Sequence, residues 1–157
     1  MNNSFELDAV DFQILNAFQE NSKISNAELS RELGMAPSGV LERVKKLEQK
    51  GVIKGYTIQI NPLALDQKLL AFISIKTSDA FGSEVTGLAL AKIPEIQEVH
   101  NVTGEDCFLI KIRVRDSEHL MNIMRNSFSK IKGIVSTKTI IVLEAVKETN
   151  HLNIQKN

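Results

Sequence analysis

The chain has 157 residues, 43% of them hydrophobic and 24% charged, and its 19 basic and 19 acidic residues cancel at pH 7. This is the composition of an ordinary globular chain of one or two small domains, and a neutral chain is not expected to coat nucleic acid through summed phosphate contacts. Because it lacks a long apolar run and a secretory start and holds one cysteine, we expect a cytoplasmic protein that neither enters membranes nor forms an internal disulfide.

Three helices are predicted in the first fifty residues. Apolar residues recur at helical spacing over residues 8–21, with Asp8 as the expected cap. The stretch "SNAE", beginning at Ser25, is a capping box, and it predicts a second helix that Gly34 ends. Pro37 suits the first turn of a third helix. Two helices joined by a short glycine turn, with another helix before them, indicate a helix-turn-helix domain.

The third predicted helix is locally cationic and carries a polar face opposite its apolar stripe. A recognition helix has this arrangement, since its first residues meet base edges in the major groove and its basic residues meet phosphates. Arg43 suits a guanine edge and Glu42 a cytosine amino group. The alternative is an ordinary solvated helix face. The predicted DNA-contacting residues are Pro37, Ser38, Gly39, Glu42, Arg43, Lys45, Lys46 and Lys50.

After Gly51 the pattern changes to strands and turns. The stretch "VIKGYTIQI" alternates and "NPLALD" interrupts it, which predicts a linker strand or hinge over residues 55–68. The following elements have the βαββαβ order of a ferredoxin-like domain. They are expected at 69–77, 83–93, 97–103, 107–114, 117–132 and 134–144.

The predicted fold class is therefore α+β, with an N-terminal helix-turn-helix domain and a C-terminal ferredoxin-like domain. The expected ranges are 1–54, the linker 55–68, the second domain 69–147 and a polar tail 148–157. Two of the expected strands carry apolar residues on both faces, although the helices of such a domain cover one face only. We therefore expect a homodimer in which two sheets stack across a twofold axis through residues 69–144.

Three stretches of the chain resemble the Lrp/AsnC ("feast/famine") family of transcription regulators. They are "LDAVDFQILNAFQEN", "ISNAELSRELGMAPSGVLERVKKLEQKGVIKGY" and "IPEIQEVHNVTGEDCFLIKIRV", and the similarity covers residues 6–147. The resemblance implies a winged or simple helix-turn-helix, a ferredoxin-like effector domain, dimers that often assemble into octamers, and small amino acids bound near dimer–dimer contacts. Two departures bear on the operator sequence: Ala36 lacks the capping oxygen frequent in the family, and Glu42–Arg43 stands where two basic residues are often adjacent.

The turn "VTGEDCF" is the candidate effector site. A free amino acid needs donors for its carboxylate and an anionic acceptor for its ammonium group. Gly104 exposes backbone amides and Asp106 supplies the acceptor, whereas the alternative is an ordinary hairpin turn. The resemblance places this turn in the family's ligand site, together with two threonines of the last strand. The candidate effector residues are Thr103, Gly104, Glu105, Asp106, Thr137 and Thr139.

No metal, cofactor or catalytic constellation is expected, because His100, Glu105, Asp106 and Cys107 match no standard zinc spacing and no triad stands out. The predicted function is a sequence-specific regulator that binds double-stranded DNA, assembles into homo-oligomers and responds to an amino acid. Two alternatives remain open. One is an effector-independent architectural DNA-binding protein, and the other is a small-molecule-binding metabolic protein with an incidental helical extension.

Overall fold

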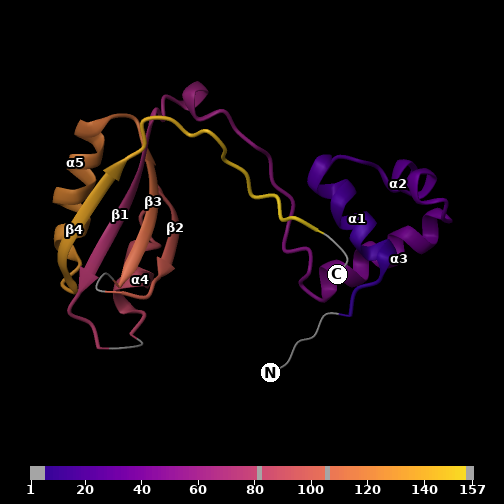
Figure 1. Cartoon of the computed structure of the whole chain (residues 1–157), viewed down its shortest axis with the longest axis horizontal. Coiled ribbons are helices and arrows are strands. Elements are labelled where there is room, and N and C mark those ends of the chain that lie inside the picture. The colour runs from indigo at the N-terminus through magenta and orange to yellow at the C-terminus, as the bar shows by residue number, and fades with distance from the viewer. Residues whose placement is uncertain (1–5, 81–82, 105–106, 155–157) are drawn as a thin grey trace. The chain divides into compact units, whose positions relative to one another are not determined.

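The computed structural model describes residues 6–80, 83–104 and 107–154. The chain divides into two compact units (Figure 1). Unit 1 contains the chain up to Gln59 together with the segment from Glu148 onward, and unit 2 contains Ile60–Lys147. The chain therefore passes between the units twice, at residues 59–60 and again at 147–148.

Unit 1 contains the three predicted helices, α1 (Ala9–Glu20), α2 (Asn26–Leu33) and α3 (Pro37–Gln49). Each helix contributes one apolar stripe to a common core, as the helical spacing predicts. The buried core side chains are Ile14, Leu29, Val40, Val44 and Leu47. The helix-turn-helix prediction is confirmed.

The predicted helix caps are present. The Asp8 carboxylate accepts hydrogen bonds from the amides of Val10 and Asp11 at 2.9 Å each, while the Asp11 carboxylate accepts from the Asp8 amide. At α2 the Glu28 amide donates to the Ser25 hydroxyl at 3.2 Å, and the Ser25 amide donates to the Glu28 carboxylate at 2.9 Å. These bonds satisfy backbone donors that have no partner within the helix, so the start of both helices is set locally.

Substituting Ser25→Ala is expected to destabilise unit 1 by about 1 kcal/mol, because α2 has only eight residues and loses its N-terminal acceptor. Urea unfolding followed through the fluorescence of Tyr56, the chain's single tyrosine, measures this change in unit 1. Ser22→Ala, in the exposed turn before α2, is the control and is expected to leave the midpoint unchanged. Equal midpoints for the two variants would contradict the capping role.

The C-terminal segment, which was expected to be a separate polar tail, lies against α1 in the described residues up to 154. The Gln19 side-chain amide donates to the Leu152 carbonyl at 2.9 Å, and the Leu152 amide donates to the Gln19 side-chain oxygen at 2.7 Å. A side-chain amide offers the same donor and acceptor as a peptide group, so Gln19 pairs with the tail as a neighbouring strand would.

Unit 2 is an antiparallel sheet of strand order β2-β3-β1-β4, with β1 and β3 in its middle (Figure 1). The strands are β1 (Leu69–Thr77), β2 (Ile96–Asn101), β3 (Phe108–Val114) and β4 (Ile134–Ile141), and the helices are α4 (Val85–Leu90) and α5 (Ser117–Asn126). Short 3-10 helices lie at η1 (Pro62–Leu65) and η2 (Phe128–Lys130). The βαββαβ prediction is confirmed, and the fold class is α+β.

One face of the sheet forms the core of unit 2 with the two helices. Ile73 and Ile75 of β1 and Ile110 of β3 are fully buried there, against Leu90 of α4 and Ile123 of α5. This alternation of buried residues along each strand is what an antiparallel sheet with one covered face requires.

The opposite face of β1 is apolar only near the start of the strand. Leu70 is buried and Phe72 is half-buried, but Ser74 and Lys76 follow them on the same face. The apolar pattern that motivated a sheet-to-sheet dimer is therefore confined to one end of this face.

Several predicted boundaries differ from the structure. The predicted linker strand over 55–68 is wrong, since the described chain there holds irregular backbone and η1. The predicted helix at 83–93 shortens to α4, because a residue before proline disfavours helical backbone and Pro94 follows closely. The helix expected at 117–132 ends at Asn126, after which η2 turns Phe128 into the core.

Strand β4 ends at Ile141 rather than at residue 144. Among the described strands β4 neighbours β1, whose register pairs Ala71 with Ile141. The last bond of this edge runs from the Val142 amide to the Leu70 carbonyl at 2.9 Å. Beyond this point β1 offers no further partner, so the strand stops.

Candidate functional site

The polar face of α3 points away from the core of unit 1. We call the exposed residues of this face the exposed ridge: Ser38, Glu42, Lys45, Lys46 and Gln49. On the opposite side of the helix, Val40 is fully buried, and Val44 and Leu47 are 6% and 2% exposed. The orientation that the helical wheel predicts is therefore present, with the ridge free to meet a partner.

The ridge carries both paired and unpaired cations. The Lys46 ammonium lies 2.8 Å from the Glu42 carboxylate, one helical turn earlier, and this hydrogen bond lowers the pKa of Glu42. Within the described residues no carboxylate pairs with Lys45 or with Lys50, which is exposed at the end of the helix. Since Lys46 neutralises Glu42, the side chains of Lys45 and Lys50 leave this surface positive.

The start of α3 is exposed as a recognition helix requires. Pro37 occupies the first turn and Ser38 is exposed, whereas Gly39 is half-buried beside Met35. Ala36 makes no side-chain cap, Pro37 has no N–H, and the Gly39 amide donates to the Ala36 carbonyl at 3.0 Å, so the Ser38 amide is the first-turn donor left without a partner among the described residues. Such an amide at a helix N-terminus is suited to an anionic group.

Arg43 is paired with two carboxylates of unit 1 in the free chain. One of its terminal nitrogens, Nη1, lies 2.7 Å from the Asp8 carboxylate and 2.9 Å from the Asp11 carboxylate, so it is turned toward α1. The Asp11 amide and the Arg43 guanidinium hold the pKa of Asp8 below its usual value, and the two carboxylates raise the pKa of Arg43. In this geometry the Arg43 guanidinium faces carboxylates of α1. The predicted contact between Arg43 and a guanine edge stays a prediction.

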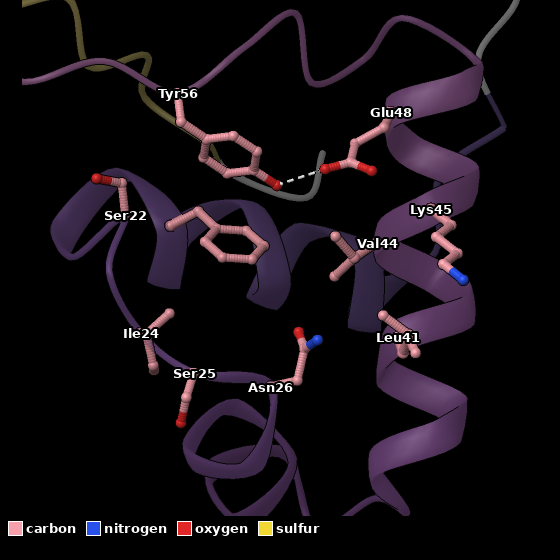
Figure 2. A pocket seen from close by; sticks show the side chains of 10 residues that line it. Ser22, Ile24, Ser25, Asn26, Leu41, Val44, Lys45, Glu48 and Tyr56 are labelled. Carbon is pink, nitrogen blue, oxygen red and sulfur yellow. Dashed lines mark hydrogen bonds between the residues drawn. The ribbon is translucent and has the colours of Figure 1, made fainter.

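A hollow of about 410 Å³ opens beside α3, between the end of α1 and the start of α2 (Figure 2). Val44 and Leu41 of α3 line it together with Ile24, and the Tyr56 ring lies along its edge. The Tyr56 hydroxyl donates to the Glu48 carboxylate at 2.9 Å. Burial, with the Glu48 carboxylate, raises the pKa of Tyr56 to about 12.

Tyr56 also meets the end of α1. Its ring packs edge-on against Phe18 with 5.5 Å between the ring centroids and 71° between the planes. Aromatic pairs favour this arrangement. Tyr56 therefore holds the chain that follows α3 against both α1 and α3. The alternating pattern of the sequence around Tyr56 gives no sign of these contacts.

Three of the predicted effector residues, Thr103, Gly104 and Thr137, lie at one end of the sheet in unit 2. Thr103 and Gly104 belong to the turn between β2 and β3, while Glu105 and Asp106 lie outside the described residues. Gly104 has a φ of 120°, a conformation that a side chain would strain, so this turn depends on glycine. In the β4 register, Thr137 pairs with Ile75, which in turn pairs with Phe108 just after the turn.

The two threonines of β4 share one face. Thr139 pairs with Ile73 and Thr137 with Ile75, so both point to the side of the sheet on which the helices pack. Neither threonine lines either of the two hollows beside α3, both of which lie in unit 1. The structure brings Thr137 to the same end of the sheet as Thr103 and Gly104.

No group of three His, Cys, Asp or Glu side chains is placed to hold a metal ion among the residues described. His100 instead lies 2.9 Å from the Glu98 carboxylate on β2. Among the helices that the structure describes, none is both long and apolar enough to cross a membrane.

Comparison with known proteins gives two domain matches in the order of the two units. Residues 7–54 match a winged helix-turn-helix DNA-binding domain, and residues 70–152 match the Lrp/AsnC ligand binding domain. The leucine-responsive regulatory protein of Haemophilus influenzae is 41% identical over 150 residues, covering 93% of this chain and 89% of that protein. The chain belongs to the Lrp/AsnC family.

Other Lrp/AsnC proteins agree in sequence and fold. The leucine-responsive regulatory protein of Escherichia coli is 40% identical over 154 residues, covering 96% of this chain and 93% of that protein. A transcriptional regulator of Neisseria meningitidis, solved in complex with L-Met, matches with a TM-score of 0.87 and 28% identity, over 94% of this chain and 97% of that one. AsnC of E. coli matches with a TM-score of 0.86 and 29% identity, over 94% and 99% of the chains.

This Lrp/AsnC protein is thus a DNA-binding transcription regulator, with its DNA-binding domain in unit 1 and the family's ligand-binding domain in unit 2. The reading of the helices as an incidental extension of a metabolic protein does not fit a chain that matches both domains of these regulators. The match to residues 70–152 reaches the C-terminal segment that pairs with Gln19.

Proposed function

We propose that this Lrp/AsnC protein binds specific DNA sequences through α3 and that an amino acid bound in unit 2 changes this binding. The observation that carries the DNA half of the proposal is the exposed ridge of α3, which includes unpaired Lys45 and has Lys50 at its end. A rigid helix that projects polar and cationic side chains is the geometry that major-groove recognition uses.

The residues of α3 divide between two roles in this proposal. Pro37, Ser38 and the backbone at Gly39 approach base edges from the start of the helix, where Ala36 places no capping side chain. Lys45, Lys46 and Lys50 bind phosphates, and these contacts set affinity more than sequence preference. Glu42 accepts from Lys46 in the free protein and holds that ammonium along the ridge.

The effector half of the proposal places an amino acid at Thr103, Gly104, Thr137 and Thr139, with Glu105 and Asp106 of the same turn. The Neisseria meningitidis regulator, solved with L-Met, supports an amino acid as the ligand class. In this proposal a second subunit completes the site, because Thr137 and Thr139 lie on β4 at the edge of the sheet, where another chain can approach. A ligand at such a contact acts by binding two assembly states with different affinity, and so changes how the α3 helices are spaced on DNA.

The same proposal includes a homodimer formed through unit 2, which can assemble further into an octamer. Phe72 of β1 and Ile140 of β4 pair across the sheet on the face that the helices leave open. Both remain partly or largely exposed in the single chain. A dimer would bury these two side chains against a second sheet, and this burial of apolar surface would stabilise it.

Selection from a pool of random duplexes at about 150 mM salt, where non-specific binding is screened, tests the DNA half. The proposal expects one related set of sequences to be enriched. Fluorescence anisotropy with the selected duplex then gives Kd with and without each common amino acid. At least one apolar amino acid is expected to change Kd by about fivefold or more.

Two outcomes separate the proposal from its rival. A steep salt dependence without any enriched sequence would favour an architectural DNA-binding protein. Sequence enrichment with identical Kd values for every amino acid would overturn only the effector half. For the site itself, Thr137→Val is expected to weaken calorimetric amino-acid binding, while Ser136→Ala, on the opposite face of the same strand, serves as the matched control.

A further inference from the structure

The contacts of Arg43 deepen the proposed function and rest on it. We infer that Arg43 is a positioning residue: it neutralises Asp8 and Asp11 and fixes α3 against the start of α1, so that the exposed ridge faces DNA while Arg43 itself reads no base. This assigns to Arg43 a role different from the guanine contact that its place on the recognition helix suggests.

The first argument is the geometry of the ion pairs. A single guanidinium nitrogen lies 2.7 Å from the Asp8 carboxylate and 2.9 Å from the Asp11 carboxylate. These are the short distances of charge-assisted hydrogen bonds. The Asp11 side chain is only 14% exposed and that of Arg43 is 32% exposed, so this pairing is better shielded from water than an ordinary surface ion pair.

The second argument is that the two carboxylates are themselves held in place. Asp8 and Asp11 form the capping box of α1, in which each carboxylate also accepts from a backbone amide. Because these hydrogen bonds hold the two carboxylates on the first turn of α1, the carboxylates cannot move far if Arg43 moves. The guanidinium therefore ties α3 to a fixed point on α1.

The third argument is the position of Arg43 around α3. Successive residues of an α-helix are about 100° apart, so Arg43 lies well away from Glu42 and the centre of the exposed ridge. It lines a hollow on the flank of α3, with Leu7, Asp11 and Leu47 on the side of the core and Glu42, Lys46 and Lys50 on the polar side. This flank is continuous with the core of unit 1.

The negative charges of Asp8 and Asp11 also favour keeping Arg43 where it is. If Arg43 swung out to bind DNA, Asp8 and Asp11 would be left as two uncompensated carboxylates close to a polyanion. No other cation pairs with either of them in the part of the chain that the structure describes. Leaving both charges unpaired opposes DNA binding, whereas keeping Arg43 in place removes most of this repulsion.

Three variants test the inference on a duplex selected by the wild-type protein: Arg43→Gln, the Asp8→Asn/Asp11→Asn pair, and all three changes together. Asparagine retains an oxygen that can cap α1, so the neutral pair keeps the helix start. We expect Arg43→Gln to weaken binding about tenfold and the triple variant to return to within about threefold of wild type, since the repulsion is then gone. Anisotropy over a series of salt concentrations measures both.

The sequence preference is the readout that a DNA-contacting Arg43 would change. We expect Arg43→Gln and the triple variant to select the same sequences as the wild type. Lys45→Gln is the control for a direct phosphate contact and is expected to reduce the slope of log Kd against log salt by about one. The triple variant is expected to keep the wild-type slope.

A lost preference at one base pair in Arg43→Gln or in the triple variant would overturn the inference, as would a triple variant that stays as weak as Arg43→Gln. Tyr56 fluorescence verifies that unit 1 of each variant is folded at the temperature of the assay. If Arg43→Gln alone does not fold, the triple variant carries the same two readouts. A wild-type protein that enriches no sequence would instead overturn the proposed function, and this inference with it.

Discussion

Replacing Lys45, Lys46 and Lys50 together with glutamine is expected to weaken binding to a selected duplex by about a hundredfold or more at about 150 mM salt. The three ammonium groups lie on or beside the exposed ridge, and two of them have no carboxylate partner among the described residues. Each phosphate contact releases condensed counterions from DNA, so three lost contacts lower both affinity and its salt dependence. Anisotropy titrations over a range of salt concentrations measure both quantities.

The matched control removes the same number of positive charges from unit 2. Lys92, Lys130 and Lys132 are exposed there, and their replacement with glutamine is expected to change affinity by less than about threefold. If both triple variants lost affinity equally, the effect would reflect net charge alone. Unchanged affinity in the variant of α3 would mean that the exposed ridge is an ordinary solvated helix face.

Gly133→Ala is expected to destabilise unit 2 by about 2–3 kcal/mol, which is the upper part of the range for overpacking a tight site. A Cβ atom at Gly133 would overlap Thr86 Oγ1 and lie 2.6 Å from Asp79 Oδ1. These atoms cannot easily withdraw, because Thr86 is 1% exposed and its amide donates to the Asp79 carboxylate. The Ser78 amide also donates to the Gly133 carbonyl at 2.9 Å, so the backbone is held as well.

We expect each unit to unfold in its own calorimetric transition, with the loss in the transition of unit 2 and not in that of unit 1. Gly55→Ala is the control for the general effect of adding a methyl group to glycine, since no atom lies within 4 Å of its Cβ position. It is expected to change the free energy of unfolding by no more than about 0.5 kcal/mol. An equally small change at Gly133 would show that Thr86 and Asp79 move aside at little cost.

The sequence by itself determined the features that depend on neighbours along the chain. The capping boxes at Asp8 and Ser25, and the left-handed turn at Gly34, form as predicted because their partners lie within a few residues. Val40, Val44 and Leu47 of α3 are also buried as helical periodicity indicates, whereas Leu41 of the same helix is 38% exposed. The order of strands and helices in unit 2 follows in the same way, although several ends shifted.

Tertiary structure alone decided the contacts that join distant parts of the chain. Arg43 pairs with residues 35 and 32 positions before it, and Gln19 pairs with a residue 133 positions after it. The periodicity of α3 shows that Arg43 flanks the exposed ridge, but it says nothing of whether a phosphate or a carboxylate of α1 takes its charge. The choice depends on which helix packs beside it. A long, flexible cation binds the nearest fixed carboxylates, and their position exists only once the helices have folded together.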